Sequence, residues 1–134
     1  NPGFDYVVLL QPTSPLRQAV DIDSCIEKCV SSNAPACVSI TASAQSPYWM
    51  YALSNDQCLL PVLTPSDKFH QRQALPSIYV LNGAVYVADI SWIKLNKSFF
   101  SEKTLGHVMP AERSVDIDAQ FDLDVCQLLL KKES

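Results

Sequence analysis

The chain has 134 residues, of which 48% are hydrophobic and 18% charged, and its formal net charge is −4. This length predicts one domain that buries roughly two-thirds of its unfolded surface. The acidic balance argues against nucleic acid as a partner, because phosphate backbones bind basic surfaces, and no apolar run is long enough for a membrane span. The low charged content indicates that part of the surface is covered, by a second copy or by a further N-terminal half.

The cysteine pattern favours a reducing compartment, and we expect a cytoplasmic location. There are five cysteines, an odd number without the spacing of a disulfide framework. Cys25 and Cys29 lie four residues apart and could share a metal. A core position is the favoured alternative, because both fall on the apolar stripe of a predicted helix and free cysteine behaves as a small buried hydrophobe.

The first predicted strand is the apolar run Val7 to Leu10, which we expect to be buried on both faces. A polar turn bounded by Pro12 and Pro15 follows it. In open α/β sheets ligands bind beyond the carboxyl ends of the strands, so Gln11 is a candidate binding residue.

A helix and a second strand follow. The helix is predicted from apolar residues at helical spacing, with Asp21 or Asp23 as its N-cap. Residues 36–42 then form the next strand, and strand, helix and strand in this order are typical of an α/β fold. The apolar positions of the helix are Ile22, Cys25, Ile26, Cys29 and Val30.

The middle of the chain is predicted as short strands and loops. Two short strands around residues 54–57 form a hairpin across the mouth of the active site. At Asn82 and Gly83 local rules favour a second hairpin. We instead predict a core strand over residues 84–88, entered through these two residues, which the family resemblance described below also implies.

The last third begins with a short helix over residues 90–96. Phe99 and Phe100 then stand in a polar stretch, where either one ring anchors a loop or at least one meets a partner or ligand. Residues 105–109 form an edge strand. A closing helix starts at Asp122 or Asp124, with Val125, Cys126, Leu129 and Leu130 facing inward.

Asp116 and Asp118 are separated by one residue, which places both carboxylates on the same side of an extended chain. Two carboxylates at the end of a strand suit Mg²⁺ when phosphates supply the remaining oxygens. The same tetrapeptide, Val-Asp-Ile-Asp, also occurs at residues 20–23, where the acids are best explained as N-cap and helix-dipole partners. Helix capping therefore remains the alternative for the second copy.

Four segments in order resemble motifs of the acylneuraminate cytidylyltransferases (CMP-sialic acid synthetases). They are LLQPTSPLR (9–17), RQALP (72–76), NGAVYV (82–87) and RSVDIDAQFDL (113–123). The resemblance implies a three-layer α/β, nucleotide-diphospho-sugar-transferase-like (Rossmann-like) sheet with flanking helices. It implies one partial domain over residues 1–134, without the family's N-terminal CTP phosphate loop, and a β-rich dimerisation and lid excursion at about 43–76 and 91–104.

The resemblance also implies the roles of individual residues. Asp116 and Asp118 match the pair that binds the catalytic Mg²⁺. The matched sugar-binding positions are Gln11, Arg72, Asn82 and Tyr86, with Arg72 a candidate for the sugar's carboxylate or else a solvated loop charge. Phe99 and Phe100 match an aromatic pair that crosses a homodimer interface into the neighbour's site. His70 and His107 lie outside the motifs and are predicted to be surface or loop residues.

The implied reaction is nucleotidyl transfer from CTP to a nonulosonic (sialic) acid, in which the sugar's anomeric hydroxyl attacks the α-phosphorus and pyrophosphate leaves. Trp49 and Val80 stand where some bacterial members carry a sugar-contacting Lys and Arg. The sugar could therefore be legionaminic acid, pseudaminic acid or KDO instead. Another alternative is a truncated, non-catalytic binding module, and we expect the isolated chain to be inactive.

Overall fold

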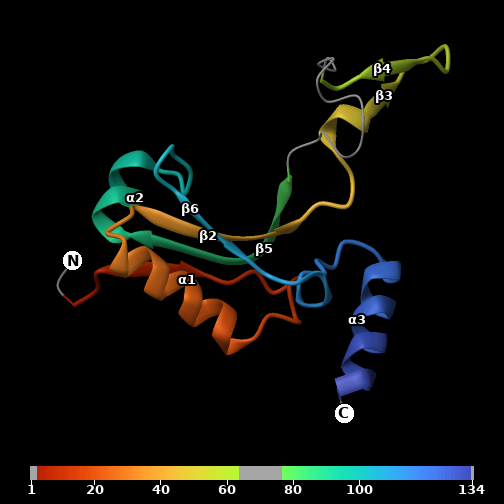
Figure 1. The fold of residues 1–134 in the computed structure, drawn as a ribbon. Coiled ribbons are helices and arrows are strands. Elements are labelled where there is room, and N and C mark those ends of the chain that lie inside the picture. Colours follow the sequence, from red (N-terminus) through yellow and green to blue (C-terminus); the bar gives the residue numbers. More distant parts are fainter. Residues whose placement is uncertain (1–2, 64–76, 134) are drawn as a thin grey trace. The chain divides into compact units, whose positions relative to one another are not determined.

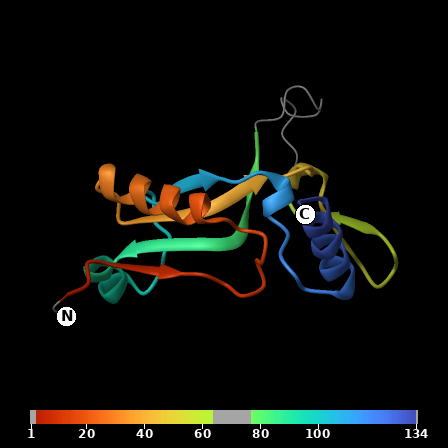
Figure 2. The same ribbon diagram turned by 90° about the horizontal axis from the view of Figure 1, so that it is seen from below.

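A central four-stranded sheet organises the computed structural model, which describes residues 3–63 and 77–133 (Figure 1). The strand order is β1-β5-β2-β6, where β1 is Tyr6–Leu9, β5 is Tyr79–Asp89, β2 is Ala36–Ala42 and β6 is Leu105–Val108. β5 is antiparallel to β1, whereas β2 and β6 are parallel (Figure 2). The mixed sheet with its helices confirms the predicted α/β class.

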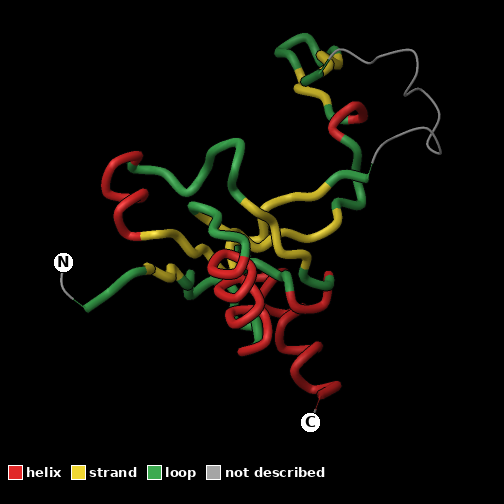
Figure 3. The backbone as a smooth tube through the Cα atoms, turned by 60° about the vertical axis from the view of Figure 1, so that its left-hand side comes forward, coloured by secondary structure: helices red, strands yellow, loops and turns green. Residues whose placement is uncertain are grey.

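Three helices accompany the sheet (Figure 3): α1 (Ala19–Ser31), α2 (Ile90–Asn96) and α3 (Gln120–Glu133). The predicted N-cap of α1 was wrong. Gln18 is the N-cap, and its backbone N–H donates to the carboxylate of Asp21, which is the third helical residue, at 2.9 Å. Asp21 thus acts from inside the first turn rather than from before it.

The core lies between α1 and the sheet. Cys25, Cys29 and Cys37 are fully buried there, and all five cysteines are free. A hydrogen bond with Cys37, together with burial, raises the pKa of the Cys25 thiol. The complete burial of Cys25 and Cys29 in this cluster supports the core interpretation for the pair.

β5 continues through Asn82 and Gly83 as one strand, so the predicted core strand is confirmed and no hairpin turns there. Gly83 has φ +71°, a left-handed conformation that glycine adopts without a steric cost. The strand then buries four residues completely, Ala84, Val85, Val87 and Ala88.

The predicted burial of the first strand on both faces was wrong. Val7, Val8 and Leu9 are 36–45% exposed. The cause is the position of β1 at the edge of the sheet, where β5 is its one neighbour among the described strands. The run of apolar residues correctly predicted a strand but not its place in the sheet.

The described residues divide into two compact units, residues 1–41 with 80–134, and residues 42–79. The second unit contains a short 3₁₀ helix (Pro47–Trp49) and an antiparallel hairpin of β3 (Tyr51–Leu53) and β4 (Leu59–Pro61). The hairpin around residues 54–57 is therefore confirmed. Its place across an active-site mouth, and the dimerisation and lid roles of residues 43–76 and 91–104, stay predictions.

The C-terminal helix was predicted correctly in kind but not in detail. α3 begins at Gln120, two residues before Asp122, and it buries Cys126. Leu130, predicted to face inward, is half exposed. No helix within residues 3–63 and 77–133 has the length and apolarity that crossing a bilayer requires.

Candidate functional site

The turn after β1 is tied to β5 by hydrogen bonds. Arg17 Nη1 donates to the carbonyl oxygen of Gln11 at 2.6 Å and to that of Ala84 at 3.3 Å. Ser14, almost fully buried, donates its hydroxyl to the carbonyl oxygen of Asn82 at 3.4 Å. Arg17 is the last residue of the first motif, and no role was predicted for it. Its charge-assisted hydrogen bonds hold the turn against β5.

Gly83 and Gln11 are in direct contact. A Cβ atom built at Gly83 would lie 2.5 Å from Gln11 Oε1, far inside van der Waals contact. The Gln11 side chain therefore lies over the bare backbone of Gly83. The structure thus brings two predicted sugar-binding positions, Gln11 and Asn82, to one place.

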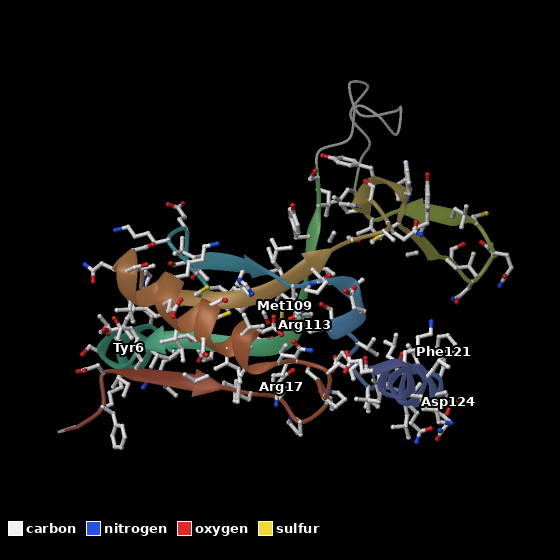
Figure 4. The ribbon with its side chains drawn as sticks, turned by 60° about the horizontal axis from the view of Figure 1, so that its bottom comes forward. Tyr6, Arg17, Met109, Arg113, Phe121 and Asp124 are labelled. Carbon is white, nitrogen blue, oxygen red and sulfur yellow. The ribbon has the colours of Figure 1, made fainter. Side chains whose placement is uncertain are left out.

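The Asn82 side chain is 5% exposed and already has protein partners on both amide atoms. Oδ1 accepts hydrogen bonds from Ser39 Oγ (2.6 Å) and the Ala84 N–H (3.2 Å). Nδ2 donates to Ser114 Oγ (3.0 Å) and Met109 Sδ (3.3 Å). Asn82 therefore joins β5, β2 and the segment after β6, and its hydrogen bond to a sugar stays a prediction. Met109 and the neighbouring Arg113 are labelled in Figure 4.

Asp116 lies in an extended segment that follows the 3₁₀ turn Ala111–Arg113, not at the end of a strand as predicted. The next residue, Ile117, donates its N–H to the carbonyl oxygen of Thr13 at 2.8 Å, which places this segment against the turn that carries Gln11. Asp116 Oδ1 is buried and has no hydrogen-bond partner among the residues that the structure describes. Such an atom is costly to leave unpaired, and a water molecule, a donor group or a cation would satisfy it.

Asp118 differs from Asp116 because its side chain is exposed. Its backbone N–H donates to Asp122 Oδ2 at 2.9 Å, as does that of Ala119. Asp122 is therefore the capping carboxylate at the start of α3, which leaves the Asp118 carboxylate available. The capping alternative applies to Asp122 rather than to Asp116 or Asp118.

Asp116 and Asp118 would hold a metal ion only if a substrate supplied further ligands. Within residues 3–63 and 77–133, no group of three or more His, Cys, Asp or Glu side chains could hold a metal. Two carboxylates, one of them with an unpaired buried oxygen, are what Mg²⁺ uses when phosphates and water supply the other ligands.

Asp21, predicted as a cap or dipole partner, is also the centre of a buried ion pair. Arg113 donates from Nε at 2.9 Å and from Nη2 at 2.7 Å to the two oxygens of this fully buried carboxylate. His107 Nε2 lies 3.8 Å from Asp21 Oδ1, so His107 is a β6 residue facing α1 and not a loop residue. Sequence reasoning missed this contact because 92 residues separate its partners.

The ionisation of Asp21 follows from these contacts. Burial by itself would raise the pKa of the carboxyl. The hydrogen bonds from Arg113 and the Gln18 N–H, with the positive charge of Arg113, outweigh burial and hold the pKa of Asp21 below its usual value.

The two predicted aromatics behave differently. The rings of Tyr86 and Phe99 are 5.3 Å apart between centroids and inclined at 52°, so Phe99 anchors its loop on β5. Phe100 remains 50% exposed and is available to a partner. Arg72 and His70 lie outside the described residues.

Gly83→Ala should lower the free energy of unfolding by about 1–2 kcal/mol, because an L-residue is strained at this φ. The new methyl group would also displace Gln11. In a Gln11→Ala background the same substitution should cost less, since only the backbone strain remains. Urea unfolding of the four proteins measures this, and identical costs in both backgrounds would disprove the contact.

Asp21→Asn should lower the free energy of unfolding at pH 7 by about 3 kcal/mol, because it removes the carboxylate and leaves the partly buried charge of Arg113 without its partner. The folded pKa of Asp21 is depressed, so its stabilising effect is present above the unfolded pKa of about 4 and is lost as pH falls towards the folded value. The difference between the two proteins should shrink below about pH 4. Urea unfolding across pH tests this. The exposed Asp23→Asn is the control, and a difference independent of pH would contradict it.

No family model matches this chain, but several curated proteins are similar to it. An N-acylneuraminate cytidylyltransferase of Streptococcus agalactiae serotype V is 32% identical over 115 residues, which are 86% of this chain and 28% of the relative. A CMP-N,N'-diacetyllegionaminic acid synthase of Legionella pneumophila is 32% identical over 96% of this chain and 55% of the relative. The chain thus spans between about a quarter and a half of these relatives.

Two further proteins are similar to this chain, one in sequence and one in fold. A post-translational flagellin modification protein B of Campylobacter coli is 24% identical over 98% of this chain and 55% of its own length. The crystal structure of a 4-diphosphocytidyl-2C-methyl-D-erythritol synthase from Anaerococcus prevotii superposes with a TM-score of 0.62 at 14% identity, covering 98% of this chain and 61% of that one, which supports the fold alone. The resemblance drawn from the four motifs is therefore confirmed, and the chain is homologous to a part of the N-acylneuraminate cytidylyltransferases and CMP-legionaminic acid synthases.

Proposed function

We propose that this chain is the sugar- and metal-binding part of a Mg²⁺-dependent cytidylyltransferase. The complete reaction would transfer CMP from CTP to a nonulosonic acid and release pyrophosphate. The similar proteins support the reaction class, and the contacts of the site support the division of roles among its residues.

The observation that carries the proposal is the unpaired buried oxygen of Asp116 beside the turn that holds Gln11. The hydrogen bond from Ile117 to Thr13 joins these two segments, which are about a hundred residues apart in the chain. A metal-binding carboxylate and a sugar-binding amide would thereby act in one site.

Asp116 and Asp118 would hold Mg²⁺, which would neutralise negative charge on the phosphates of CTP. The chain's own residues would mainly orient the sugar. Gln11 would hydrogen-bond it, held by the Arg17 contact with its backbone, and Arg72 would bind its carboxylate. No general base is assigned.

The sugar is either an N-acylneuraminate or a related acid such as N,N'-diacetyllegionaminate, because relatives named for both are 32% identical to this chain. Pseudaminic acid and KDO remain further alternatives. Trp49 and Val80, where some members carry charged sugar contacts, are 39% and 50% exposed. Binding measured for each of these sugars in turn distinguishes them.

A non-catalytic binding module is the second candidate function. For the cytidylyltransferase we also propose a cytoplasmic location, where CTP is available. We expect no pyrophosphate release when the isolated chain is mixed with Mg²⁺, CTP and N-acetylneuraminate. Release would exclude the binding-module alternative.

Nuclear magnetic resonance of the ¹⁵N-labelled chain tests the proposed site directly. Mn²⁺, used as a paramagnetic substitute for Mg²⁺, should broaden the amide signals of residues 114–118. N-acetylneuraminate should shift those near Gln11 and Gly83. Asp116→Asn should remove the Mn²⁺ effect and spare the sugar shifts, because the two ligands use different residues. Broadening that persists unchanged would disprove the metal assignment.

We also propose a homodimer. The hairpin of β3 and β4 exposes several apolar side chains close together, and monomeric proteins rarely expose large apolar patches. Phe100, half exposed beside the anchored Phe99, is a second apolar contact point. The most exposed residues of the hairpin and its flank are Leu53, Leu59, Leu60 and Val62, each 51–63% exposed.

Sedimentation at micromolar concentration should therefore give twice the mass of one chain. Leu60→Lys should yield a monomer with an unchanged circular dichroism spectrum, because it places a charge in the apolar contact. Leu128→Lys, on the exposed side of α3, is the matched control and should stay dimeric. A monomer in the unmodified chain would overturn the dimer.

A further inference from the structure

Burying the Asp21 carboxylate costs desolvation free energy, and its ion pair with Arg113 need not make the fold more stable than apolar residues would. Asp21 is fully buried, and replacing a buried pair by apolar groups is often neutral or stabilising. What distinguishes such a pair is geometry, because a guanidinium that donates from two nitrogens to two oxygens is fixed in direction as well as in distance.

Arg113 ends the 3₁₀ turn that leads into the segment of Asp116. The segment is then held at two further points. Ser114 Oγ accepts from Asn82 Nδ2 and donates to the carbonyl oxygen of Pro110 at 2.7 Å. Beyond Asp116, the Ile117 N–H is bonded to the backbone of the first turn.

Asp116 therefore lies between anchors on both sides. Arg113 and Ser114 precede it and Ile117 follows it, so the backbone at Asp116 has little freedom to move. Without the ion pair, the first anchor would be lost, and the hydrogen bonds of Ser114 and Ile117 would remain to hold the segment.

We propose that Asp21 and Arg113 are positioning residues that hold Asp116 in its ligand geometry. This inference rests on the proposed function, in which Asp116 binds the metal. Two of the Arg113 nitrogens are occupied by Asp21, so the ion pair acts through the backbone and not by touching a substrate. Asp21, in the first Val-Asp-Ile-Asp copy, thereby positions Asp116 in the second copy.

Arg113→Lys is the sharpest test, because it keeps the charge but cannot make the two-pronged contact. Amide hydrogen exchange should be about tenfold faster at Ile117 than in the unmodified chain, after correction for the change at core amides such as that of Val85. Val87→Ala, a core truncation on β5, is the matched control and should speed all core amides without singling out Ile117. A corrected rate at Ile117 equal to that of the control would overturn the proposal.

The metal supplies a second measurement. Arg113→Lys should weaken Mn²⁺ binding, followed by amide broadening at residues 114–118, about tenfold. In the Asp116→Asn background the same substitution should have no further effect, which a general loss of stability would not reproduce. An equal effect in both backgrounds would overturn the positioning role. If Mn²⁺ fails to bind the unmodified chain, the proposed metal site is disproved, and the exchange rate at Ile117 still decides whether the ion pair holds the segment.

Discussion

The site depends on one buried amide. Asn82 is held between Ser39 on β2, its own strand and Ser114; the first two contacts are buried and the third is partly buried. A buried polar group left without its partner costs about 1–3 kcal/mol, so the three segments are expected to form together or not at all. The position of the Asp116 segment is thus a consequence of the way β5 enters the sheet.

Glycine at position 83 makes this arrangement possible. Its positive φ lets β5 change direction while it remains in the ladder, and its missing side chain gives Gln11 room. Arg17 then donates to two carbonyl oxygens, one from the turn and one from β5. The turn after β1 is therefore held by contacts to β5 and not only by its prolines.

Exposed apolar surface occurs in both compact units. β1 is an edge strand in which Val7, Val8 and Leu9 are 36–45% exposed, and the hairpin of β3 and β4 carries leucines that are more than half exposed. The low charged content of the chain has its structural counterpart in these surfaces. It is consistent with a polypeptide that functions as part of a larger assembly, as the proposed dimer requires.

The sequence by itself determined the elements that short-range patterns encode. The strand at 36–42, the helix at 90–96 and the hairpin around 54–57 follow from apolar periodicity and turn residues, and four motifs in order identified the homologous family. The core strand after Gly83 was predictable only with the help of that resemblance, because Asn-Gly also favours a hairpin.

Tertiary structure alone decided which residues meet. β5 inserts between β1 and β2, which leaves β1 at an edge and half exposed. Asp21 pairs with Arg113, which makes a structural anchor of an acid that local rules explain as a helix cap. Local sequence specifies dihedral angles and amphipathic faces within a few residues, whereas burial and ion pairing depend on contacts between residues far apart in the chain, which no periodicity records.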